Sequence, residues 1–385
     1  MKITQIRSAV AVVPLTKPIS WATAAVTERE YILVWVTGED GLTGVGYGLG
    51  SRYPGGARIM HEVIQEQLAP LALGTDSWMT EDLWARAYQR TLLLGRRGAV
   101  MRGLSALDIA LWDLNAKAAG VPLYRLLGGH RSEVPAYASG GYYSAGDPLK
   151  DLEEEIGAYL DRGFDAVKIK VGGQPLAVDA ARLKLVREMI GPERRVALDA
   201  NNAWTSVVDA QRAAERFAPY DPWWFEEPFG PDSAASFAEL ARRTSLPLAT
   251  GELEATRWPF RQFLDERSVH ILQPDATVCG GVTEWRRIAQ MCAGFDVPVA
   301  PHWAAEIHSH LVAASPNGLA VEYFTPDRDI VNFDRLLARP LAPQKGWIRL
   351  TEEPGYGLIL DNDVVVRHLR HDSHPGQMLP ATHQP

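Results

Sequence analysis

From about Val134 onward, short runs rich in β-branched and aromatic residues alternate with amphipathic helical stretches. A strand followed by a helix, repeated along the chain, predicts a parallel sheet whose strands are joined by helices. Eight such strands suit a closed (β/α) barrel better than an open, doubly wound sheet. The strand candidates are VPAYASG, AVKIKVG, RVALDAN, WWFEEP, LPLATGE, HILQPDA, VPVAPHW and LAVEYF.

The residues before and after this repeat have a different pattern. The run EYILVWVTGEDGLTGVGYG predicts a β-hairpin, because two apolar stretches flank an Asp-Gly turn. Three helical patterns follow it. Strands and loops return near the C-terminus, where we also expect a mobile polar tail. We therefore divide the chain into the N-terminal part of an α+β cap (1–130), a barrel (131–340) and a segment that returns to the cap (341–385).

Ionisable side chains stand at the carboxyl ends of seven consecutive barrel strands. In a parallel barrel these ends form one face, on which barrel enzymes place their active sites. Buried charges are costly unless they are paired or bound to a metal, so a structural role alone does not easily explain seven of them. In chain order they are Lys168 with Lys170, Asp199 (followed by the polar Asn201), Glu226 with Glu227, Glu252, Asp275, His302 and Glu322.

Three of these carboxylates belong to neighbouring strands. Asp199, Glu226 and Glu252 would repel one another unless a cation lay between them. An all-oxygen site selects a hard cation, and these three strand ends offer no His or Cys for zinc. The sequence therefore predicts Mg²⁺ as the cofactor. A network of these acids with Arg or Lys is the alternative interpretation.

Candidate bases flank the predicted metal. In AVKIKVG both lysines point to the same side, because side chains alternate along a strand. We expect the ammonium group of Lys168, together with the cation, to lower the pKa of Lys170 so that it acts as a base. On the other side, Asp275 would orient His302 and raise its basicity. Either base would remove the α-proton of a metal-bound carboxylate and form an enediolate.

As a series, these motifs resemble the enolase superfamily, specifically its mandelate racemase / muconate lactonizing enzyme group. The resemblance covers nearly the whole chain and includes KIK, LDANNAW, EEP, TGE, QPD with CGGVTEW, and PHW. It implies a modified TIM barrel, (β/α)7β, with an α+β capping domain, and the Mg²⁺ and enediolate chemistry established for that superfamily. The implied roles are metal ligation by Asp199, Glu226 (rather than Glu227) and Glu252, base catalysis by Lys170 with Lys168 and by His302 with Asp275, and hydrogen bonding to the substrate carboxylate by Glu322.

The cap is expected to set specificity. From loops near Pro18–Thr27 and Gly48–Gly56 we select Trp21, Arg52 and Tyr53 as possible substrate contacts, together with Asn201 of the barrel. For Trp21 the alternative role is packing between the domains, and for Arg52 it is an exposed position on the surface.

Two reactions share the predicted first step. Loss of a β-hydroxyl after proton removal gives a 2-keto-3-deoxy acid, so the favoured function is a dehydratase of a sugar acid or tartrate-like diacid. Return of the proton by the opposite base would make the protein a racemase or epimerase. A non-catalytic binding module is a more remote alternative, because such a protein would be expected to lose some of the bases and ligands.

Composition excludes other classes. The net charge of −8, without long charge runs, argues against nucleic-acid and membrane-surface partners. Two cysteines make no disulfide framework, and the N-terminal residues resemble a strand rather than a signal peptide. We expect a cytoplasmic protein with a small-molecule carboxylate substrate, and the resemblance implies a homo-oligomer.

Overall fold

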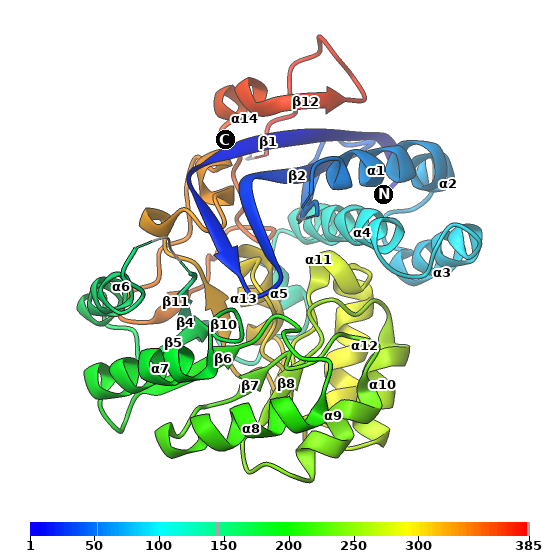
Figure 1. The fold of residues 1–385 in the computed structure, drawn as a ribbon. Coiled ribbons are helices and arrows are strands. Elements are labelled where there is room, and N and C mark those ends of the chain that lie inside the picture. Colours follow the sequence, from blue (N-terminus) through cyan, green and yellow to red (C-terminus); the bar gives the residue numbers. More distant parts are fainter. Residues whose placement is uncertain (52, 144–145, 383–385) are drawn as a thin grey trace.

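Two β-sheets organise the chain in the computed structural model, which describes residues 1–51, 53–143 and 146–382. The antiparallel sheet of the cap has the order β12-β1-β2-β3, and Figure 1 shows it above the barrel. Its strands are β1 (Ile3–Trp21), β2 (Ala24–Gly38), β3 (Thr43–Leu49) and β12 (Leu369–Asp372). The other cap elements are helices α1 (Gly56–Val63), α2 (Ala69–Ala72), α3 (Thr80–Thr91), α4 (Ala99–Ala118), α5 (Leu123–Leu126) and α14 (Asn362–His368), with a π-helical turn at Ile64–Leu68.

The barrel strands are parallel and follow one another in the order of the chain, which confirms the predicted fold class. The order is β10-β4-β5-β6-β7-β8-β9, so the first and last strands pair with each other. They are β4 (Glu133–Ser139), β5 (Ala166–Lys170), β6 (Arg195–Asp199), β7 (Phe225–Glu226), β8 (Leu248–Thr250), β9 (Ile271–Leu272) and β10 (Val321–Tyr323).

The predicted strand VPVAPHW is reduced to a single bridged residue. Val299 forms parallel bridges to Leu272 on one side and to Gly318 on the other, and so closes the barrel between β9 and the segment before β10. Pro298 and Pro301 explain the shortening, because neither residue has an N–H group to donate to a neighbouring strand.

Helices surround the barrel strands (Figure 1). Helix α8 shows how the sequence sets them: the Ser206 side chain caps its first turn, and its alanines and Phe217 form the buried face. The helices of this layer are α6 (Lys150–Asp161), α7 (Leu176–Ile190), α8 (Val207–Phe217), α9 (Ala234–Ala241), α10 (Arg257–Asp265), α11 (Ala276–Cys279), α12 (Gly281–Ala293) and α13 (Ala305–Ala313), with 3-10 turns at Ala218–Tyr220, Pro326–Arg328 and Phe333–Leu336.

Glycines in β3 allow helix α4 to lie directly on the strand. A Cβ atom on Gly46 would lie 1.9 Å from the Ala106 carbonyl oxygen, and one on Gly44 would lie 2.1 Å from that of Ala110. The same helix contacts the barrel, because Asp108 accepts hydrogen bonds from the amide and hydroxyl groups of Thr283. Helix α4 therefore connects the cap sheet to the barrel.

The hairpin of β1 and β2 extends from the cap to the barrel. Trp21 pairs with Ala24 at its tip, so most of the segment predicted as a loop at Pro18–Thr27 is strand. Ser20 pairs with Tyr143 after β4, and the Thr23 hydroxyl donates to the Asn201 carbonyl oxygen at 3.3 Å. The hairpin tip thus contacts the face of the barrel that carries the strand ends.

The segment after residue 340 contacts both parts of the molecule. Strand β11 (Trp347–Arg349) pairs with β4 of the barrel, whereas β12 pairs with β1 of the cap. Buried Arg7 fixes the second contact through its pair with Asp372, with Nε and Oδ1 2.9 Å apart. The exact division into 1–130, 131–340 and 341–385 stays a prediction. Within the described residues, no helix is both long enough and apolar enough to span a membrane.

Candidate active site

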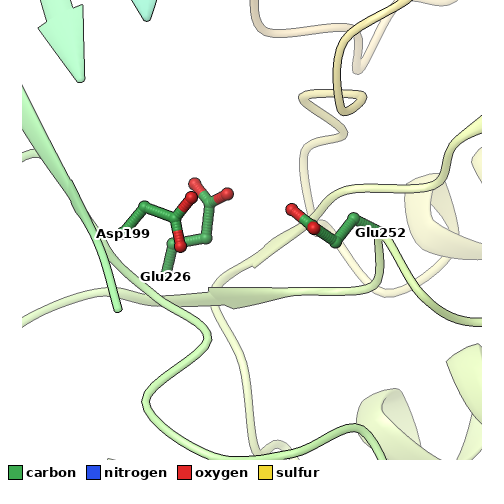
Figure 2. Close-up of side chains that lie close together, drawn as sticks. All are labelled: Asp199, Glu226 and Glu252. Atoms are coloured by element: carbon green, nitrogen blue, oxygen red, sulfur yellow. The ribbon is translucent and has the colours of Figure 1, made fainter. Parts of the chain in front are cut away.

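Three buried carboxylates converge at the carboxyl ends of neighbouring strands. Asp199 ends β6, Glu226 ends β7, and Glu252 follows β8 by two residues. One oxygen from each lies within 4.8 Å of the other two, and Figure 2 shows the side chains pointing toward one another. The three strand ends predicted to supply metal ligands are therefore brought together.

The chemistry of this triad fits Mg²⁺. All three donors are oxygen atoms, the type that a hard divalent cation prefers. One buried oxygen of Glu252, Oε2, has no hydrogen-bond partner, as expected of an atom that awaits a ligand. Glu227 is directed differently: its backbone has a φ of 44° and its carboxylate accepts from the Asn202 amide.

Lys168 lies between two acids on the same face of the barrel. Its Nζ is 2.7 Å from Glu226 Oε1 and 2.7 Å from Glu322 Oε1. Burial raises the pKa of Glu322, but the positive charges of Lys168, His302 and Lys170 together outweigh this effect and bring that pKa to about 2. Lys168 therefore neutralises part of the negative charge beside the triad.

Lys170 contacts the triad on the β6 side. Its ammonium group pairs with Asp199 Oδ2. Burial and the nearby Lys168 lower the pKa of Lys170, but Asp199, Tyr142 and Glu322 together outweigh them, so the pKa is raised in this arrangement. The expected lowering depends on a cation at the triad and stays a prediction for the metal-bound protein. A cation on the triad would compete for the Asp199 carboxylate.

His302 approaches the triad from the β8 side. Its Nε2 lies 3.8 Å from Glu252 Oε1, and its Nδ1 lies 3.1 Å from Asp275 Oδ2. Partial burial lowers the pKa of His302, but Glu252 and Asp275 outweigh it and bring the pKa to about 9. Because β7 separates β6 from β8, the amine and the imidazole stand on two sides of the carboxylates.

Trp303 holds two of these acids in place. Its indole N–H donates to Asp275 Oδ2 at 2.8 Å, and its backbone N–H donates to Glu322 Oε2 at 2.7 Å. The Thr277 amide donates to the other Asp275 oxygen at 2.7 Å. These bonds orient Asp275 toward His302 and fix Glu322 next to Lys168.

A cavity of about 310 Å³ lies between the cap and the strand ends. Lys170, Glu252 and His302 line it from the barrel, as does Asn201, and Trp21 lines it from the cap. Its size is at the lower end of the range for ligand pockets, roughly 300–1,000 Å³.

Tyr53 and Arg52 were also predicted to contact the substrate from the cap. Tyr53 does not line this cavity: it lies in the turn before α1 with its side chain 64% exposed, and its amide donates to the Ser51 hydroxyl. Arg52 lies outside the described residues. Ser51, which sequence reasoning did not select, lines the cavity instead.

Further cavity residues were also missed by sequence reasoning. Arg29 of β2, Arg102 of α4 and Tyr142 after β4 line the same cavity. Tyr142 packs against Lys170, and the Lys170 Nζ lies 4.8 Å from the centroid of the Tyr142 ring. Neither arginine has a local signal, because Arg29 lies between Glu28 and Glu30 in a charged part of β2 and nothing around Arg102 distinguishes it from a surface arginine.

Comparisons with known proteins agree with this geometry. Residues 4–128 match the mandelate racemase / muconate lactonizing enzyme N-terminal domain, and residues 151–364 match an enolase C-terminal domain-like family. An arabinonate dehydratase from Saccharolobus solfataricus is 35% identical over 83% of this chain and 86% of its own.

Solved structures agree over almost the whole chain. A racemase from Streptomyces coelicolor with bound magnesium has a TM-score of 0.89 and 31% identity, over 96% of this chain and 100% of that one. An L-talarate dehydratase from Polaromonas, complexed with Mg and L-glucarate, has a TM-score of 0.88 and 30% identity, over 97% of this chain and 98% of that one. Fold, sequence and the position of the acidic triad lead to one assignment: the chain belongs to the mandelate racemase / muconate lactonizing enzyme group of the enolase superfamily.

Proposed function

We propose that this protein is a Mg²⁺-dependent dehydratase of acid sugars that converts a hydroxylated carboxylate into a 2-keto-3-deoxy acid and water. The observation that carries the proposal is the arrangement of the carboxylate triad between Lys170 and the His302–Asp275 pair, with Lys170, Glu252 and His302 lining one cavity of about 310 Å³. The relatives named as dehydratases of arabinonate and talarate support this reaction class.

The roles of the residues follow from their positions. Mg²⁺ held by Asp199, Glu226 and Glu252 would bind the substrate carboxylate and stabilise the negative charge that develops when the α-proton leaves. Lys170 or His302 takes that proton, because both groups line the cavity beside the triad. A protonated imidazole, favoured by Asp275, gives its proton to the leaving β-hydroxyl, which departs as water. Glu322 hydrogen-bonds the substrate carboxylate as the donor, which requires its own carboxyl group to be protonated when the substrate is bound, because two carboxylates share no hydrogen bond without a proton.

Keto-acid trapping tests the proposal. The enzyme with Mg²⁺ is incubated with a library of aldonic and aldaric acids, and semicarbazide is used to detect 2-keto products. We expect at least one acid to give a chromophoric semicarbazone. Lys170→Ala and His302→Asn should each abolish it, whereas Lys184→Ala, on the exposed side of α7, should leave it unchanged. If no acid gives a keto product, the dehydratase assignment is wrong.

Racemisation or epimerisation is the second candidate, and the two-sided placement of the bases favours it. One base takes the α-proton and the other returns a proton to the opposite face of the same carbon. The relative described as a racemase supports this alternative. In D₂O, deuterium uptake with inversion and without keto product would identify a racemase, whereas keto product identifies the dehydratase.

We also propose that the protein acts in the cytoplasm as a homo-oligomer on a small-molecule carboxylate. The L-talarate dehydratase structure with L-glucarate supports the substrate class. Sedimentation velocity of the purified protein tests the oligomeric state, and a monomer at micromolar concentration would contradict it.

A further inference from the structure

Two arginines enter the active-site cavity from the cap. Arg29 lies on β2 and is 6% exposed, and Arg102 lies on α4 and is half-buried. Both line the cavity whose other wall carries Lys170, Glu252 and His302. Positive charge from the cap therefore faces the barrel groups across the space in which the substrate would lie.

Within the described residues, each of the two guanidinium groups donates one hydrogen bond to the protein. Arg29 Nε donates to the Ile330 carbonyl oxygen at 3.0 Å, and Arg102 Nη1 donates to that of Leu49 at 3.2 Å. Among the described residues, neither guanidinium has a carboxylate partner within ion-pair distance. The other N–H donors of both groups are thus available to a ligand, and a guanidinium presents five in total.

The position of each guanidinium is fixed before a ligand arrives. The Arg29 Cζ lies 5.8 Å from the centroid of the Trp21 ring, and the bond to Ile330 holds Nε. The bond to Leu49 holds Arg102 next to the β3 end of the cavity wall. A desolvated cation without a partner is costly, and a bound anion removes that cost.

From this arrangement we infer that the substrate is a dicarboxylic sugar acid, whose second carboxylate is bound by Arg29 and Arg102 while the first lies at the triad. The inference rests on the proposed function for the orientation of the substrate, and it adds the chemical class of its far end. An acid sugar that ends in a hydroxymethyl group would leave both guanidinium groups without an anion. Arg29 and Arg102 are then specificity-determining residues.

The test compares acids that differ only at the far carbon. Galactarate and galactonate form one pair and glucarate and gluconate another, each pair with one configuration and either a carboxylate or a hydroxymethyl end. Calorimetry with Mg²⁺ and the Lys170→Ala protein measures binding without turnover. For at least one pair we expect the diacid to bind about 10-fold more tightly or better, the size of a charge-assisted hydrogen bond.

Variants of the two arginines test the assignment residue by residue. In the Lys170→Ala background, Arg29→Met and Arg102→Met should each weaken diacid binding about 10- to 100-fold and change monoacid binding less than about threefold. The diacid affinity of Arg102→Lys should lie between that of the Lys170→Ala parent and that of Arg102→Met, because lysine keeps the positive charge but lacks the planar guanidinium group. Arg58→Met, which removes an exposed charge from α1, is the matched control and should change neither affinity.

The outcomes separate this inference from the proposed reaction. If no acid yields a keto product with the unmodified enzyme, the dehydratase proposal fails while a diacid preference still supports the anion site. If no diacid binds more tightly than its monoacid, or the preference survives both arginine variants, the anion site is wrong whatever the reaction is. Tighter binding of 6-phosphogluconate than of glucarate would assign the site to a phosphate group and overturn the second carboxylate.

Discussion

Replacing Gly46 by alanine tests the closest contact in the cap. A Cβ at this position would lie 1.9 Å from the Ala106 carbonyl oxygen and 2.8 Å from the Ala110 nitrogen, both backbone atoms of α4. The helix would have to move by more than about 1 Å, because well-packed interiors have no room for an added methyl group. Helix α4 cannot move freely, since Asp108 accepts hydrogen bonds from Thr283 on the barrel.

The magnitude follows from two opposing effects. Overpacking of this kind costs about 1–3 kcal/mol, and we expect the upper end because the obstacle is backbone. Alanine recovers roughly 0.5–1 kcal/mol over glycine in a strand, because it loses less conformational entropy on folding. The net expectation for Gly46→Ala is a loss of about 2 kcal/mol in the free energy of unfolding.

Gly48 provides the matched control on the same strand. The nearest atom to a Cβ at Gly48 is the flexible Met60 methyl group at 3.3 Å, so Gly48→Ala should be neutral or slightly stabilising. Urea unfolding followed by tryptophan fluorescence measures both variants against the parent protein. Equal midpoints for the two variants would show that β3 and α4 are not in direct backbone contact.

Three further predictions concern the metal and the acid stability. Mg²⁺ should raise the unfolding temperature of the parent protein, because a ligand that binds only the folded state stabilises it, and Glu252→Gln should lose most of that rise in a thermal shift assay. Asp275→Asn should lower kcat by at least about 10-fold while leaving the Mg²⁺ shift intact, because it removes the group that orients His302 but no triad ligand; an unchanged kcat would contradict that role. Burial lowers the pKa of His310 from 6.5 to about 3, so its contribution to stability is present above pH 6.5 and is lost as the pH falls toward 3. His310→Asn should flatten the pH dependence of the unfolding free energy in this window by up to roughly 4 kcal/mol, and parallel curves for variant and parent in urea titrations would refute the assignment.

The barrel and its charged face follow from local pattern. Alternating strands and helices predict parallel strands, and a parallel arrangement places all their carboxyl ends together. The strand-end pattern selects Asp199 and Glu252, and the family resemblance selects Glu226 over Glu227; the structure brings one oxygen of each within 4.8 Å of the others. The strand at Val299 is shorter than its apolar pattern predicts, because the two neighbouring prolines have no N–H group to donate to an adjacent strand.

The cap side of the cavity could not be predicted in the same way. Which residues of the cap line the cavity depends on how its sheet docks on α4 and the barrel, and no local periodicity encodes that docking. Arg102 was therefore not selected although it lines the cavity, whereas Tyr53 was selected although it is exposed and does not. The ion pair between Lys170 and Asp199 was missed for a related reason, since it joins side chains of two different strands.

The pairing of β1 with β12 also has a consequence for biosynthesis. Arg7 and its partner Asp372 are 365 residues apart, a distance that a ribosome covers in roughly 20–70 s. Throughout that time the outer edge of β1 lacks a neighbouring strand, and an uncovered edge is prone to pair with other chains. The outer edge of β1 is therefore unpaired during most of the synthesis of the chain, and chaperones that bind exposed strand edges would act on this segment first.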